Sequence, residues 1–241
     1  LRYFRRRFDV LGTFEKAAAA EADGARANRL ISAAVHGSLP GAERLVELGL
    51  SRPQPELRKS MVRLLADKRF RVADAPAEAM LLKLIGTEPD VLLRRAAVRA
   101  LAERGSARAY GPVAALLNSQ DLKDRSDGLF LASGYLRQDP RTGPLLLQAE
   151  ARETNRGLRG DMLRNICARG GNEYPTLLAS RLRTGTKIEK MDVLHYLYVW
   201  SGPVAPLAPA LQAASADPDP QVRQKATARL AELRVRPAGS R

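Results

Sequence analysis

The strongest constraint on the fold of this chain is an internal repeat with a period of about 33 residues. Six times, at intervals of 31 to 36 residues, a basic residue lies near the start of an apolar helical run, and a proline opens another apolar run ahead of it. The basic residues are Arg58, Arg94, Arg125, Arg159, Lys190 and Arg223, and the prolines are Pro40, Pro76, Pro112, Pro144, Pro175 and Pro206. Two helices per unit at this period indicate an α-solenoid, in which each unit packs on its neighbours.

The second run of each unit repeats its apolar positions. Four units superpose without gaps and place apolar residues at relative positions one, five and nine, which lie on one face of a helix. These residues are Leu57, Met61 and Leu65; Leu93, Ala97 and Leu101; Leu158, Met162 and Ile166; and Val222, Ala226 and Leu230. Two units fit less well, because Asp124 and Glu189 occupy the first apolar place, and Gly128 and Ala132 also stand in the unit at 121–132.

Local chemistry supports two helices per unit. Proline is tolerated in the first turn of a helix, where its missing N–H has no intrahelical partner, so the prolines predict first-helix starts. An acid or amide precedes four of the basic residues by four positions and is expected to cap the second helix and to pair with the basic residue. These caps are Asp90, Asp121, Asn155 and Asp219. In a stacked array the basic residue also reaches the neighbouring unit, which predicts an architectural role for the column.

The combination of a cap, an aliphatic-Arg pair, a small residue and a Leu resembles the HEAT-like repeats of the phycobilisome-lyase type. The resemblance covers about residues 40–233 and implies a right-handed superhelix of about six repeats. It does not specify a function, because that family includes scaffolds, bilin lyases, an iron hydroxylase and DNA glycosylases.

We therefore expect an all-α chain in three parts. Residues 1–39 form a basic segment and capping helices, residues 40–233 the solenoid, and residues 234–241 a flexible tail. The composition is 45% hydrophobic but only 5% aromatic, which predicts an Ala/Leu core. β-rich signals, such as alternating segments joined by Asn-Gly turns, are missing from the sequence.

Charge is the strongest functional signal. The formal net charge of +14 indicates an anionic partner, which is an acidic protein surface, a nucleic acid or an anionic lipid surface. The second helices of such arrays usually line the concave side, so cations one and five positions beyond the basic column are predicted to form a partner-binding stripe. These cations are Lys59, Arg63, Arg95, Arg99 and Arg164, and Asp127, Asp161 and Asp192 are expected to neutralise its middle.

Aromatic residues gather near the end of the repeat region. By resemblance to HEAT-like alkylpurine DNA glycosylases, which hold a damaged nucleotide with Trp or Tyr and an Asp, the group Asp192, Tyr196 and Trp200 is an alternative nucleotide-binding site. Tyr196 and Trp200 stand one helical turn apart, however, a spacing equally natural for packing against the next unit. Core packing is the favoured interpretation.

The first eight residues combine aromatic side chains with Arg2, Arg5, Arg6 and Arg7. Such a segment suits a lipid headgroup boundary, which would make the domain membrane-associated on the cytoplasmic side. The alternative is a short helix whose arginines are solvated and whose aromatic residues cover the first repeat.

Catalytic and metal-dependent functions find little support. With two His and one Cys there is no metal-ligand set of the usual spacing, and the His-Glu pairs of the iron hydroxylase are absent. Cys167 follows Ile166 on an apolar face and is expected to be a buried hydrophobe. We expect no cofactor and no metal, and predict a non-enzymatic, cytoplasmic scaffold with an acidic protein partner; nucleic-acid binding, with or without base excision, is the alternative.

Overall fold

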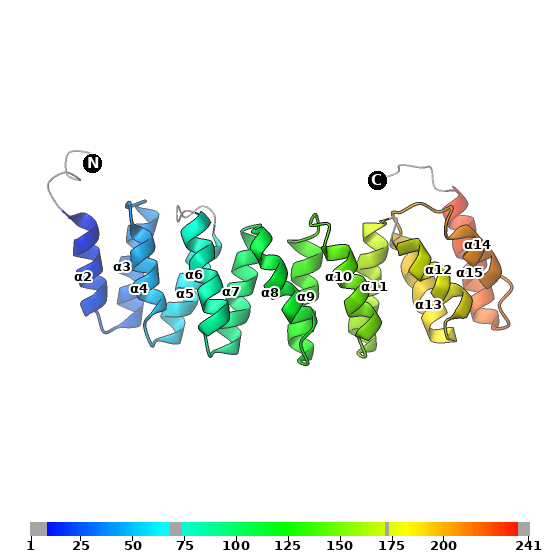
Figure 1. The fold of residues 1–241 in the computed structure, drawn as a ribbon, viewed down its shortest axis with the longest axis horizontal. Coiled ribbons are helices and arrows are strands. Elements are labelled where there is room, and N and C mark those ends of the chain that lie inside the picture. Colours follow the sequence, from blue (N-terminus) through cyan, green and yellow to red (C-terminus); the bar gives the residue numbers. More distant parts are fainter. Residues whose placement is uncertain (1–8, 68–73, 172–173, 236–241) are drawn as a thin grey trace. The chain divides into compact units, whose positions relative to one another are not determined.

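The computed structural model describes residues 9–67, 74–171 and 174–235, and these residues form an all-α solenoid (Figure 1). They contain fourteen α-helices, two short 3-10 helices and no strand. The α-helices are α2 (Val10–Ala20), α3 (Gly24–His36), α4 (Ala42–Leu50), α5 (Pro55–Ala66), α6 (Asp74–Thr87), α7 (Val91–Glu103), α8 (Tyr110–Leu117), α9 (Leu122–Gly134), α10 (Thr142–Arg152), α11 (Arg156–Arg169), α12 (Tyr174–Thr184), α13 (Lys187–Tyr196), α14 (Ala208–Ala214) and α15 (Pro220–Val235). The 3-10 helices are η1 (Ala107–Ala109) and η2 (Leu197–Val199).

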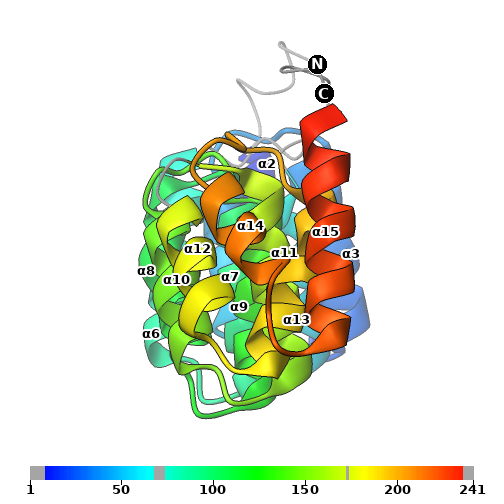
Figure 2. The same cartoon turned by 90° about the vertical axis from the view of Figure 1, so that its right-hand side faces the viewer.

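Contacts divide the chain into two compact units, Leu1–Arg137 and Gln138–Arg241. In the first unit the helical pairs are α2–α3, α4–α5, α6–α7 and α8–α9, and the second helices α3, α5, α7 and α9 pack in sequence on one another. In the second unit α11, α13 and α15 form the corresponding row, and Figure 2 shows it beside the layer of α10, α12 and α14. The six predicted pairs are present, and residues before 40 add a seventh, α2–α3.

The predicted helix signals are confirmed in most places. Asp90, Asp121, Asn155 and Asp219 each accept hydrogen bonds from N–H groups in the first turn of their helices. Four of the six prolines lie within the first three residues of α6, α8, α10 and α12. The other two, Pro40 and Pro206, stand two residues ahead of α4 and α14, so they precede the first helix instead of opening it.

The core consists of the repeated apolar positions. All twelve residues at relative positions one, five and nine of the four regular units are buried. In the irregular unit Gly128 is also buried, and a Cβ built on it would lie 2.8 Å from the backbone nitrogen of Leu117. A glycine stands here because α9 approaches the backbone of α8 too closely for a side chain.

The two acids that interrupt the apolar pattern connect neighbouring repeats. Arg95 of α7 donates to Asp124 of α9, and Arg159 of α11 donates to Glu189 of α13 at 3.0 Å. In two other repeats the acid lies in the loop before the second helix, two residues ahead of the cap. There Arg58 donates to Glu88 at 3.1 Å, and Lys190 donates to Asp217 at 2.6 Å.

The two arrangements are alternatives. The loop position is Glu88 before α7 and Asp217 before α15, but it is Ser119 before α9 and Thr184 before α13. Among the second helices from α7 onward, only α9 and α13 have an acid at the first apolar position of the helix. These are also the two helices without an acid two residues ahead of the cap. Each of these four pairs of repeats is thus joined by at least one ion pair between a cation and a carboxylate.

Candidate partner-binding groove

The basic column itself is used by the architecture. Arg94 donates through Nη1 to the carbonyl oxygens of Glu88 and Pro89, at 2.5 and 3.0 Å, in the loop before its own helix. Arg125 and Arg223 make the same pair of bonds to their own loops. The predicted ion pair between cap and column residue is therefore replaced by bonds to the loop backbone, because the caps are already engaged with helix N–H groups. These cations are not available to a partner.

The position five residues beyond the column faces solvent in every repeat. Its occupants are exposed in both units: Arg63, Arg99 and Phe130 in the first, and Arg164, His195 and Ala228 in the second. Side chains at this position of a second helix therefore form part of the solvent-exposed surface of their repeats.

Two of these side chains border a groove of about 390 Å³ between α5 and α7 in the first unit. Val62, Ala66, Ala96 and Ala100 give it an apolar lining. The other lining residues are Lys59, Arg63, Leu92, Arg99 and Glu103. Three of the lining residues are alanines, whose side chains are small. Larger side chains at these positions would fill the space that forms the groove.

The three cations of the groove differ in how firmly they are held. Arg63 is exposed and makes no hydrogen bond or ion pair with any described residue. Lys59 Nζ lies 2.7 Å from Glu56 Oε1, on a glutamate whose side chain is 81% exposed, so the pair is weak. An incoming carboxylate therefore meets two cations that it can engage without breaking a strong interaction.

Arg99 is held in place from two sides. Its Nε donates to Glu103 Oε1 at 2.7 Å, which raises the pKa of the guanidinium, and its Cζ lies 5.5 Å from the centre of the Phe130 ring. The Tyr135 hydroxyl donates to the same oxygen of Glu103 at 3.2 Å. Glu103 accepts only from Nε of Arg99, and the side chain of Arg99 is 57% exposed, so the guanidinium remains accessible to solvent.

The remaining cations of the predicted stripe lie elsewhere. Arg95 is only 17% exposed and pairs with Asp121 at 2.8 Å and with Asp124, whose hydrogen bond raises the pKa of Arg95. Arg164 is exposed on α11 in the second unit. The structure thus brings Lys59, Arg63 and Arg99 together in the lining of one groove, and Arg95 and Arg164 are not among its lining residues. Sequence patterns did not indicate Leu92, Glu103 or Tyr135 as part of this surface.

The alternative nucleotide-binding residues do not share a surface. The helix α13 ends at Tyr196, and η2 then redirects the chain, so Trp200 is not one helical turn beyond Tyr196. Trp200 is 3% exposed and donates through Nε1 to the carbonyl oxygen of Pro203 at 3.3 Å. Asp192 lies 3.6 Å from Arg156, and burial raises the pKa of the Tyr196 hydroxyl. The indole face on which a base would stack is packed in the core.

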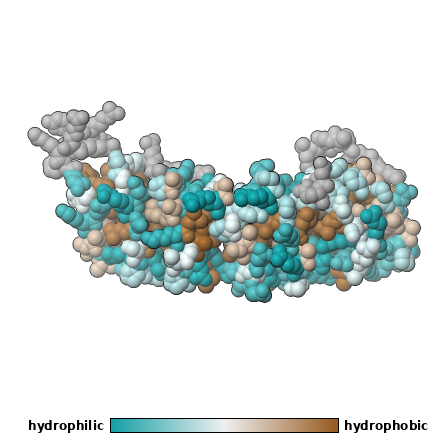
Figure 3. Space-filling view, viewed as in Figure 1, coloured by the Kyte–Doolittle hydropathy of each residue, from teal (hydrophilic) through white to brown (hydrophobic). Residues whose placement is uncertain are grey.

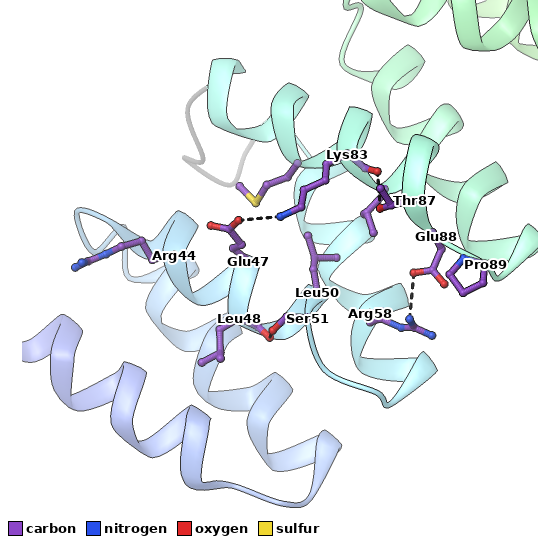
Figure 4. Close-up of a pocket in the computed structure, with 12 residues that line it drawn as sticks. Arg44, Glu47, Leu48, Leu50, Ser51, Arg58, Lys83, Thr87, Glu88 and Pro89 are labelled. Carbon is purple, nitrogen blue, oxygen red and sulfur yellow. Dashed lines mark hydrogen bonds and ion pairs between the residues drawn. The ribbon is translucent and has the colours of Figure 1, made fainter.

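A second hollow of about 570 Å³ lies between α4, α5 and α6. Figure 4 shows that Glu47 and Lys83 pair across it, 3.6 Å apart, and that Arg58 and Glu88 pair at its far end. Its remaining cation, Arg44, pairs with Glu15 at 3.1 Å. Two acids, Glu47 and Glu88, accompany the three cations of this hollow, whereas Glu103 is the one acid beside the three cations that line the α5–α7 groove, so the hollow is the poorer anion site of the two.

The other predicted features lie outside both hollows. Cys167 is fully buried, and burial raises the pKa of its thiol to about 12. Arg2, Arg5, Arg6 and Arg7 lie outside the described residues. Within the described ranges, no helix is both long and apolar enough to cross a membrane, and no group of three or more His, Cys, Asp or Glu side chains is arranged to hold a metal ion. Figure 3 shows hydrophilic and hydrophobic side chains interspersed over the face seen in Figure 1.

Comparison with known proteins finds a similarity over part of the chain. A family model described as HEAT repeats matches residues 42–129, which run from the start of α4 into α9 and include the whole α5–α7 groove. No curated protein matches the chain. The match does not distinguish the phycobilisome-lyase type from other HEAT repeats. The similarity to HEAT repeats is therefore found for the segment from α4 into α9, and the stacked helical pairs of the described residues agree with it.

Proposed function

We propose that this chain is a non-enzymatic interaction scaffold that binds an acidic segment of a partner protein in the α5–α7 groove. The single observation that carries the proposal is the exposed Arg63, which pairs with no acid among the described residues and lines the same partly apolar groove as the preorganised Arg99. HEAT-type repeats in the same stretch support a scaffold, since such arrays present extended surfaces for binding.

The finer parts of the sequence prediction belong to this proposal. The phycobilisome-lyase type of HEAT-like repeat is supported by the observed caps and the column of basic residues next to aliphatic ones. A cytoplasmic protein is supported by the single, buried cysteine, which leaves no disulfide to form within the chain.

An acidic protein segment suits the groove better than a duplex of nucleic acid does. The phosphates of DNA require a series of cations along the path of the backbone. The structure instead uses the basic column for its own loops and buries Arg95 against two aspartates. What remains at the groove is a short group of three cations around an apolar lining, and that mixture matches a peptide.

The test uses charge reversal at two exposed sites. Arg63→Glu combined with Arg99→Glu is expected to weaken binding of a fluorescein-labelled, glutamate-rich peptide at least tenfold, which corresponds to about 1.4 kcal/mol. Arg164→Glu changes the same repeat position in the second unit and is expected to have little effect. Fluorescence anisotropy measures binding, and circular dichroism checks that the helices remain.

Three results would count against the proposal. Equal losses in the double variant and in Arg164→Glu would mean that the peptide responds to net charge alone. Unfolding of the double variant would assign these arginines to the architecture. Tighter binding to a DNA duplex than to the peptide, with affinity falling steeply with salt, would favour the nucleic-acid alternative.

A further inference from the structure

The α5–α7 groove contains a pattern that says more about its partner than charge alone, although its interpretation rests on the proposed function. Its cations stand on both sides of an apolar lining: Lys59 and Arg63 come from α5, and Arg99 comes from α7. Leu92 adds a large apolar side chain that is 63% exposed, an unusual exposure for a leucine. A partner that fits must present an apolar strip with anionic groups on both flanks.

The two flanks have defined spacings. Lys59 and Arg63 are four residues apart on α5, which places them about 6 Å apart along the helix axis. Arg63 and Arg99 occupy the same repeat position on adjacent second helices, whose axes are about 8–10 Å apart when helices pack in contact. Carboxylates on one turn of a helix, at i and i+4, match the first spacing, and carboxylates on opposite sides of an apolar stripe match the second.

An extended segment matches this arrangement less well. Side chains of an extended chain alternate between two opposite faces, so residues between the apolar ones would point away from the groove into solvent. A helix directs the residues beside its apolar stripe sideways, toward the groove walls. The α5 and α7 helices are 12 and 13 residues long, enough to hold about three turns of such a helix.

We infer that the groove is a docking site for an acidic amphipathic helix, with its apolar face on Leu92, Ala66 and Ala96 and its flanking carboxylates on Lys59, Arg63 and Arg99. Arg99 is the anchor, because Glu103 and Phe130 already fix its guanidinium and less side-chain freedom is lost on binding. Recognition of this kind is a helix-in-groove mode, in which apolar anchors recur at i, i+3, i+4 and i+7.

Two labelled peptides of identical composition and charge test the inference. In the first, leucines at i, i+3, i+4 and i+7 form one stripe with glutamates on both sides. In the second, the same residues are rearranged so that no helical stripe exists. The patterned peptide is expected to bind the full chain at least about tenfold more tightly, a difference of about 1.4 kcal/mol. Its circular dichroism is expected to show helix formation on binding.

Leu92→Gln is the matched variant, because it removes the apolar wall without changing charge at an exposed position. It is expected to reduce the preference for the patterned peptide to threefold or less, about 0.65 kcal/mol on the same scale. Leu122→Gln is the control, since Leu122 is 46% exposed near the start of α9 and does not line the groove.

The possible results separate the helix inference from the proposed function. Equal binding of both peptides, lost in the Arg63→Glu, Arg99→Glu variant, would overturn the helix and leave an acidic partner. A preference unaffected by Leu92→Gln, or affected equally by Leu122→Gln, would place the helix somewhere else. Failure of both peptides to bind would overturn the proposed function together with the inference.

Discussion

The buried carboxylate of Glu150 makes the sharpest test of how the second unit is held together. Glu150 on α10 is completely buried. Both of its oxygens accept from Arg181 of α12, and Oε1 also accepts from Arg159 Nε of α11 at 3.0 Å. One carboxylate thus joins three helices. Glu150→Gln removes its charge while nearly preserving its shape, so any loss of stability reflects the charge and not a cavity.

The size of the effect follows from what each arginine loses. Arg159 keeps Glu189 at 3.0 Å, but Glu150 is the only acid with which Arg181 pairs among the described residues, and Arg181 is only 13% exposed. Breaking a buried ion pair on one side costs about 3–5 kcal/mol, and the lower end applies because one cation of the two retains a partner. At a slope of about 1.5 kcal/mol per molar urea, a loss of about 3 kcal/mol lowers the unfolding midpoint by about 2 M.

Trp200 provides the assay. It is the single tryptophan of the chain and is buried in the second unit, so its fluorescence in a urea titration reports on that unit. Glu150→Gln with Arg181→Met is the control. It removes the uncompensated cation and is expected to recover much of the loss, because apolar replacements of buried ion pairs are often neutral. The reasoning would be refuted if Glu150→Gln alone lowered the urea midpoint by less than about a tenth of the expected shift, compared with the unchanged protein.

Two further predictions concern titration and reactivity. Hydrogen bonds from the Thr186 backbone N–H and from Arg159 lower the pKa of Glu189 from 4.5 to about 2. This stabilisation is complete above pH 4.5 and is lost as the pH falls toward 2, so Glu189→Gln is expected to flatten the dependence of the urea midpoint on pH in that range; an unchanged slope would contradict the assignment. Cys167 is expected to react with a thiol reagent at about pH 8 only when urea unfolds the chain, because its thiol is buried and its pKa is about 12; rapid labelling of the folded chain would contradict this.

Much of the fold could be predicted because each repeat gives an independent check on which positions of the helices are buried. Position five of the second helix is Met61, Ala97, Met162 or Ala226 in the regular units, and each is buried, so the register established in one unit holds in the others. The helix N-caps could also be predicted, because a short polar side chain just before an apolar helical run accepts hydrogen bonds from the first N–H groups of that helix.

Contacts between repeats were harder to predict. Asp124 and Glu189 looked like defects in the apolar pattern, yet each receives an arginine from the preceding repeat. The signal that explains them is the residue two places before the cap, which is Ser119 or Thr184 in those repeats and an acid before α7 and α15. It becomes readable only when two positions of neighbouring repeats are compared together.

The candidate site was only partly readable for the same reason. Helical periodicity predicts that Arg63 and Arg99 occupy equivalent exposed positions. Whether a neighbouring cation is free to bind a partner, however, depends on the acids of the next repeat. Arg95 lies one position beyond the column, as Lys59 does, yet Arg95 meets Asp121 and Asp124 while Lys59 meets only the exposed Glu56. A pattern within one repeat cannot distinguish them.

Net charge alone therefore overstates how strongly this chain attracts polyanions. The column arginines satisfy loop carbonyls or join repeats, and such cations cannot neutralise phosphates without loosening the stack. Within the α5–α7 groove, three cations remain accessible: Arg63, which pairs with no described acid, Lys59, which pairs with the exposed Glu56, and Arg99, which is 57% exposed beside Glu103. The proposed binding surface is then short and mixed with apolar residues, and for that reason a patterned peptide, and not a longer polyanion, is the informative probe.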